Sequence, residues 1–160
     1  MIEQILTYLG IAIMVGLTGI GSAIAVSICG QSTVGAMKKN SEGLGSYIVL
    51  SALPSTQGLY GFVGFFLTLN LVKKLMAASL LNMTAAWAIF GVGVALGFVG
   101  FFSALYQAKV CANGIKTIGG GDNVFGATMV MAVFPELYAI LALLVVILTT
   151  GAVPALVGMA

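Results

Sequence analysis

Charge is what this sequence has least of: only 6% of its 160 residues are Asp, Glu, Lys or Arg. A soluble domain carries about 25% charged residues. Six basic and four acidic side chains cannot cover the surface of a soluble protein of this length, and 61% of the residues are hydrophobic. The chain is therefore predicted to be an integral membrane protein. Its net charge of +2 is too small to indicate a nucleic-acid partner.

Histidine is absent, and cysteine occurs only twice. Because histidine is the commonest metal ligand and a common general base, its absence argues against His-ligated metal sites and against catalysis by a histidine base. Cys29 and Cys111 lack CxxC spacing. We therefore interpret both as small buried hydrophobic residues.

The few charges separate long apolar segments. Uncharged stretches run from Glu3 to Lys38, from Glu42 to Lys73 and from Lys74 to Lys109, and after Asp122 only Glu136 is charged. Each stretch exceeds the roughly 20 residues that a membrane-spanning helix needs. This predicts four transmembrane helices, at about 5–37, 44–72, 82–117 and 124–153. The first segment lacks a basic n-region and is longer than an h-region, so we expect it to be retained as a span.

Short connections join these helices, which predicts an all-α membrane protein made of two helical hairpins in series. After the glycines at 119–121, Asp122 or Asn123 is well placed to cap the last helix. Lysines indicate an orientation: four lie at the ends of the first and third helices and two lie on the opposite side (Lys38, Lys39, Lys109 and Lys116; Lys73 and Lys74). This bias favours cytoplasmic 1–2 and 3–4 loops in a multi-pass protein of the cell membrane.

The two hairpins look like copies of one unit within a single membrane domain, 1–160. The sequence GLYG at 58–61 matches ELYA at 136–139 at an offset of 78, and each match follows a proline. This indicates a duplication, with a first repeat at 1–78 and a second at 79–160. In that register Gly58 stands where the second copy has Glu136, so the first copy has lost its carboxylate.

Glycine is concentrated in the first and third helices, at positions 10, 16, 19, 21, 91, 93, 97 and 100. Glycine lets helix backbones approach closely in a membrane, so we expect these helices inside and the bulkier second and fourth helices outside. That asymmetry suits a ring of hairpins. Ser22 and Ser103 are interpreted as close-packing residues.

Glu136 is a lone carboxylate in the last apolar segment. An ionised side chain in hydrocarbon costs at least about 2.5 kcal/mol on insertion scales, so such a group usually has a function. The default interpretation is an ion or proton carrier. Pro135, directly before it, biases Phe134 away from helical geometry and frees the carbonyl of Met131; its effect on the site is not predicted.

Other polar residues are expected at the depth of Glu136. Gln107 precedes Gly120, Glu136 follows it, and Gln57 follows Gly43, each by about four turns of helix. At about 1.5 Å of rise per residue, Gln107, Glu136 and Gln57 are roughly 20, 24 and 21 Å from the loops. Three side chains from three helices therefore reach one level near the middle of the bilayer.

The second helix adds further oxygen atoms at this level. Pro54 leaves a carbonyl free and predicts a kink, and Thr56, Gln57 and Tyr60 can share one helix face. One carboxylate among neutral oxygens suits a hard monovalent cation. A proton carrier would need only the carboxyl and one hydrogen bond, so we favour Na⁺ and keep H⁺ as the alternative. The competing structural interpretations are that Glu136 only bonds the second helix and that Thr56, Gln57 and Gln107 only join helices.

Three blocks carry a family resemblance: LPSTQGLYGF at 53–62, QAKV at 107–110 and PELYAIL at 135–141. With them the chain resembles the rotor-ring proteolipid (K or c subunit) of V-type and A-type rotary ATPases, and is similar to the bacterial sodium-pumping members. The resemblance implies that the Leu53 carbonyl and the side chains of Thr56, Gln57, Gln107 and Glu136 bind sodium. It also implies that Tyr60 holds the glutamate.

The same resemblance implies a homo-oligomeric ring in membrane lipid, a stator subunit with an essential arginine, and a central-stalk subunit. ATP would be hydrolysed or made in other subunits, so this chain would not be an enzyme by itself. Two other classes remain open. One is a stand-alone four-helix secondary transporter or channel, and the other is a structural membrane scaffold.

Overall fold

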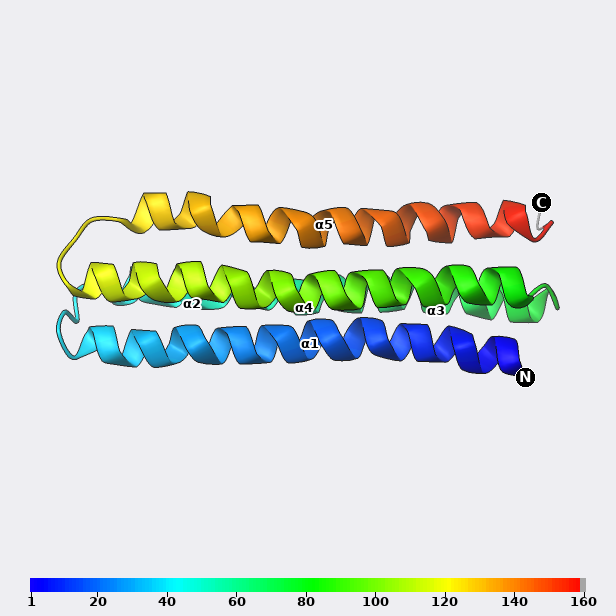
Figure 1. Cartoon of the computed structure of the whole chain (residues 1–160), viewed down its shortest axis with the longest axis horizontal. Coiled ribbons are helices and arrows are strands. Elements are labelled where there is room, and N and C mark those ends of the chain that lie inside the picture. The colour runs from blue at the N-terminus through cyan, green and yellow to red at the C-terminus, as the bar shows by residue number, and fades with distance from the viewer. Residues whose placement is uncertain (159–160) are drawn as a thin grey trace.

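The computed structural model describes residues 1–158, which form four long antiparallel rods of helix (Figure 1). Three rods are continuous: α1 (Ile2–Met37), α4 (Met83–Gly119) and α5 (Phe125–Leu156). The other consists of α2 (Leu44–Ala52), a 3₁₀ turn η1 (Leu53–Ser55) and α3 (Thr56–Ala77). All four rods are long and apolar enough to cross a membrane, which confirms the predicted all-α fold of four transmembrane helices.

The rods are connected as two hairpins in series. The 38–43 and 120–124 connections lie at one end of the bundle, and the 78–82 connection lies at the other end with the start of α1 and the end of α5 (Figure 1). The predicted topology is therefore confirmed. The lysine-based orientation stays a prediction.

The predicted cap of the last helix is wrong. Gly121 ends a turn with φ +106°. Asp122 and Asn123 lie in the irregular segment that follows, and α5 starts only after Val124, which makes no side-chain cap. The Asp122 carbonyl instead accepts from the Val124 N–H at 3.2 Å. A side-chain cap is found at Asn82, whose Oδ1 accepts from the Ala85 N–H at 3.0 Å at the start of α4.

The glycine-rich helices α1 and α4 pack directly against each other; their predicted place inside the bulkier helices stays a prediction. A Cβ at Gly10 would lie 2.5 Å from Phe90 Cα, and one at Gly21 would lie 2.8 Å from Phe101 Cα. Any side chain at Gly93 would collide with the Gly10 backbone. Only glycine permits this backbone-to-backbone approach, which brings the two helices close enough to fix the positions of the outer rods.

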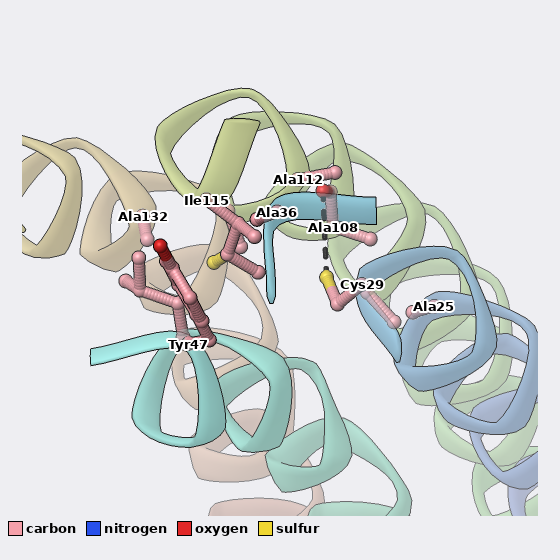
Figure 2. Close-up of a cluster of buried hydrophobic side chains, with 11 residues drawn as sticks. Ala25, Cys29, Ala36, Tyr47, Ala108, Ala112, Ile115 and Ala132 are labelled. Atoms are coloured by element: carbon pink, nitrogen blue, oxygen red, sulfur yellow. Dashed lines mark hydrogen bonds between the residues drawn. The ribbon is translucent and has the colours of Figure 1, made fainter. Parts of the chain in front are cut away.

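Small side chains continue this packing toward the end of the bundle that carries the 38–43 and 120–124 connections. Figure 2 shows this cluster, where Cys29 on α1 donates to the Ala108 carbonyl of α4 at 3.6 Å. Tyr47 of α2 belongs to the same cluster and lies beside Ala132 and Ile115. Cys29 and Cys111 are both fully buried free thiols, which confirms their interpretation as packing residues.

The two prolines near the middle of the bundle have different effects. At Pro54 the helix tightens into the 3₁₀ turn η1 between α2 and α3. Proline lacks an N–H, and its ring would clash with the carbonyl four residues earlier in a regular α-helix. At Pro135, α5 continues without a break. The expected bias of Phe134 away from helical geometry is therefore not seen.

The structure gives the register in which the two hairpin copies correspond. Ser22 on α1 accepts at 2.8 Å from the N–H of Gly58, which lies four residues after Pro54. Ser103 on α4 donates to the Pro135 carbonyl at 2.8 Å. Each serine therefore bonds the backbone of a neighbouring helix at a proline or one turn after it, and the two serines, like the two prolines, are 81 residues apart.

This register corrects the counterpart of Glu136, which is Ser55 and not Gly58. The match at an offset of 78 aligned similar residues three positions out of register. At 81, Val26 is the counterpart of Gln107. The first copy thus carries neither a carboxylate at the position of Glu136 nor an amide at the position of Gln107. The repeat boundaries at 1–78 and 79–160 stay a prediction.

Candidate functional site

A chain of hydrogen bonds joins the polar residues that the sequence placed at one depth. Tyr60 on α3 donates to Glu136 Oε1 at 2.6 Å. Gln107 on α4 donates through Nε2 to Glu136 Oε2 at 3.0 Å. Gln57 on α3 in turn donates to Gln107 Oε1 at 2.9 Å. Side chains of α3 and α4 therefore converge on one carboxylate of α5.

The 3₁₀ turn adds the remaining oxygen atoms. Thr56 Oγ1 donates to the Leu53 carbonyl at 3.0 Å and lies 3.4 Å from Gln57 Oε1. Because η1 is wound more tightly than an α-helix, the Leu53 carbonyl, the Thr56 hydroxyl and the Gln57 amide oxygen follow one another at the start of α3. All five predicted ligand residues, with Tyr60, are thus brought together.

The site is fully buried at its two glutamines and more exposed at the carboxylate. Gln57 and Gln107 are fully buried, whereas Thr56, Tyr60 and Glu136 are half-buried in the isolated protomer. Every buried polar side-chain atom in the described part of the chain has a hydrogen-bond partner. A satisfied polar network inside an apolar bundle is rigid and specific.

Ser103 belongs to this network, although the sequence suggested only a packing role. Its Oγ accepts from Gln57 Nε2 at 3.1 Å and donates to the Pro135 carbonyl at 2.8 Å. Gln107 makes a similar contact to α5, from Nε2 to the Ala132 carbonyl at 2.9 Å. Ser103 precedes Gln107 by one helical turn and so shares its helix face, which is the signal that could have identified it.

Two of these contacts also reach the backbone of α5 at and just before Pro135. Side chains of α4 bond the carbonyls of Ala132 and Pro135 on α5. The proline segment is therefore held against α4 at the level of Glu136.

The donor set is made of oxygen atoms with a single negative charge. Within residues 1–158, no group of three or more His, Cys, Asp or Glu side chains comes together to hold a metal ion. One carboxylate with hydroxyl, amide and carbonyl oxygens suits a hard monovalent cation or a proton. A divalent cation would leave the low-dielectric site with net positive charge, which is costly.

The contribution of Tyr60 can be tested by carbodiimide, which reacts with protonated carboxyl groups. Tyr60→Phe removes a donor that stabilises the charged form of Glu136. A hydrogen bond to a charged group contributes about 1.5–3 kcal/mol, so labelling of Glu136 at neutral pH should become about tenfold faster. The matched control is Tyr138→Phe, because Tyr138 is 64% exposed. Equal rates in the two variants would show that the Tyr60 bond has no such effect.

Comparison with known proteins gives the same two-copy pattern. Residues 9–68 and 90–149 each match the family model of the ATP synthase C subunit. The second match begins and ends at an offset of 81 from the first, which is the register of Ser22 and Ser103.

Two curated relatives align with most of the chain. The A-type ATP synthase subunit K of Methanocaldococcus jannaschii is 37% identical over 144 residues, which cover 90% of this chain and 61% of that protein. The V-type sodium ATPase subunit K of Enterococcus hirae is 34% identical over 125 residues, or 78% of this chain and 76% of that protein. The chain thus spans less than two thirds of the first relative. Since the family model covers more than half of the sequence in two copies, the chain belongs to the ATP synthase C-subunit family.

Proposed function

We propose that this chain is the ion-carrying rotor subunit of a V/A-type rotary ATPase and that each copy carries one Na⁺ at Glu136. The observation that supports this most strongly is the position of Glu136. The carboxylate lies within the membrane-spanning bundle, held by Tyr60 at 2.6 Å and Gln107 at 3.0 Å. A membrane carboxylate fixed by neutral groups from neighbouring helices is poised to exchange a cation.

Sodium is proposed over the proton because of the oxygens that a proton does not need. Leu53, Thr56 and Gln57 present a carbonyl, a hydroxyl and an amide oxygen in sequence along η1 and α3. Replacement of a hydration shell by such oxygens is how a hard cation is held. The Enterococcus hirae relative is a subunit of a sodium ATPase. The proton remains the alternative cargo.

Charge neutralisation explains how the site could cross lipid. Glu136 with one monovalent cation has no net charge, whereas the free carboxylate would be expensive to move through hydrocarbon. We propose that a filled site travels past lipid and that an arginine of a stator subunit displaces the ion from the carboxylate. This chain's residues bind and release the cargo, and ATP is hydrolysed or made in other subunits.

The assembly is proposed to be a homo-oligomeric ring in the cell membrane that turns with a central-stalk subunit. Large apolar side chains remain exposed on the outer helices of the protomer, including Phe62, Phe66, Phe134 and Leu148. Such surfaces require lipid or neighbouring copies as partners. The 38–43 and 120–124 loops are proposed to face the cytoplasm on the basis of the lysine bias.

The other function classes predict different assemblies. A stand-alone transporter or channel should be a small oligomer that moves ions when purified and reconstituted alone. A structural scaffold should carry no ion at all. Sizing in mild detergent separates these cases from the rotor, which should be a large ring that resists dissociation.

Sodium protection of Glu136 against carbodiimide is the direct test of the proposal. The purified ring should be labelled at Glu136, and added Na⁺ should slow the labelling at constant pH, because the bound ion displaces the reactive proton. The same concentrations of K⁺ serve as the ionic-strength control. Protection by raised pH alone, with no effect of sodium, would replace Na⁺ by H⁺ as the cargo.

A further inference from the structure

The hydrogen-bond partners of the two buried glutamines fix which way each side-chain amide faces. Gln107 uses both Nε2 hydrogens, for the Ala132 carbonyl and for Glu136 Oε2. Its Oε1 is therefore left to accept from Gln57. Because a carbonyl and a carboxylate can only accept, the orientation of the Gln107 amide is fixed from α5.

The Gln57 amide is oriented in the same way. Its Nε2 donates to Gln107 Oε1 at 2.9 Å and to Ser103 Oγ at 3.1 Å. The Ser103 hydroxyl hydrogen is already donated to the Pro135 carbonyl at 2.8 Å, so Ser103 can only accept from Gln57. Gln57 Oε1 must then face Thr56 Oγ1, on the side where the proposed ion binds.

The two acceptors that hold Gln57 are not equivalent. Gln107 Oε1 belongs to the proposed ligand set, so a bound cation competes for it. Ser103 has no place in that set, and it is anchored to the backbone of α5 through the Pro135 carbonyl. Ser103 is therefore the acceptor that keeps Gln57 in place while the ion is bound.

We infer that Ser103 is a positioning residue: it turns the Gln57 amide oxygen toward the cation and so sets the affinity of the site for Na⁺ relative to H⁺. This inference rests on the proposed function. Without Ser103, one buried N–H of Gln57 would lose its partner, and the amide would be free to leave the ligand geometry. The contacts from Tyr60 and Gln107 to Glu136 would remain, so proton binding should change little.

The first repeat supplies a matched control. Ser22 occupies the equivalent position on α1, is 7% exposed against 6% for Ser103, and also bonds the neighbouring helix, at the Gly58 N–H. No hydrogen bond links Ser22 to a glutamine among the described residues. Ser22→Ala therefore removes a similar interhelical bond, to the backbone N–H of Gly58, without removing a partner of the Gln57 side chain.

The experiment measures carbodiimide labelling of Glu136 in purified rings as a function of Na⁺ and, without Na⁺, of pH. Ser103→Ala should raise the Na⁺ concentration for half-protection about tenfold, the cost of one buried hydrogen bond. The pH profile without sodium should stay within about 0.3 units of the unsubstituted ring. Ser103→Thr, which keeps a hydroxyl, should restore sodium protection, and Ser22→Ala should leave both curves unchanged.

Three outcomes would overturn the inference. They are unchanged sodium protection in Ser103→Ala, an equal shift in Ser22→Ala, and a parallel shift of the sodium and pH curves, which would indicate general loosening of the site. If the variant rings dissociate, Ser103→Thr alone decides, because a low sodium affinity in an intact Thr ring would contradict the role of the hydroxyl. If the unsubstituted ring shows no sodium protection, the sodium proposal itself fails and the inference with it.

Discussion

Glu136→Gln is expected to abolish ion binding and ion transport while leaving the bundle intact. The substitution removes the single negative charge that compensates the cation in a low-dielectric site. Loss of one partner of a buried ion pair costs about 3–5 kcal/mol, which corresponds to roughly a 100- to 1,000-fold or greater loss of affinity. Sodium binding to the purified ring and transport by the reconstituted complex would measure this loss directly.

The glutamine variant has nearly the same shape, but its NH₂ group replaces the Oε2 that accepts from Gln107 Nε2, so it should keep the bond from Tyr60 and lose the one from Gln107. Its amide oxygen can still accept from Tyr60, which donates to Glu136 Oε1 in the structure. The appropriate control is Glu42→Gln, a substitution of the same chemistry in the exposed loop between α1 and α2. Normal transport by Glu136→Gln would contradict both the proposed cargo site and the rotor function.

Gly93→Ala is expected to disrupt the contact between α1 and α4. The added methyl group would be placed against the backbone of Gly10, including its carbonyl, and backbone atoms cannot move aside as a flexible side chain can. Overpacking of a core typically costs about 1–3 kcal/mol and sometimes more. We expect about 3 kcal/mol or more here, since the whole helix pair must separate to admit the group.

Gly91→Ala is the matched control, because a methyl group at Gly91 meets nothing within 4 Å. The two variants differ by two positions on the same helix, so they report on contact with α1 and not on helix propensity. The measurement is the yield and thermal stability of the assembled ring in mild detergent. Equal stability of the two variants would show that α1 and α4 do not pack at Gly93 as described.

The membrane spans could be predicted because two simple constraints act on them. Hydrocarbon excludes charge, so the positions of Glu3, Lys38 and the other charged residues mark where helices end. A helix rises by a constant amount per residue, so Gln57, Gln107 and Glu136 could be placed at one depth by counting from the loops. The structure joins these three side chains by hydrogen bonds.

The misplaced cap and the repeat register show where such counting fails. Asp122 and Asn123 have the right chemistry for a cap, but they lie in the irregular segment after the turn at Gly121, and the residue before α5 is Val124. The match of GLYG to ELYA aligned similar residues, whereas the interhelical bonds of Ser22 and Ser103 and the two family-model matches agree on an offset of 81. Similarity between two short sequence segments does not show which of their residues face a neighbouring helix.

The sequence by itself determined the class of the protein, its four spans, their hairpin connections and the residues that reach the depth of Glu136, because burial in lipid and helix rise depend only on order and spacing. Only the tertiary structure decided that Ser103 bonds Gln57 and that the carbonyls of Ala132 and Pro135 orient the glutamines. These contacts depend on how each helix is rotated about its own axis against its neighbours. That rotation is set by the close approach of α1 and α4, which residue spacing along one chain does not specify.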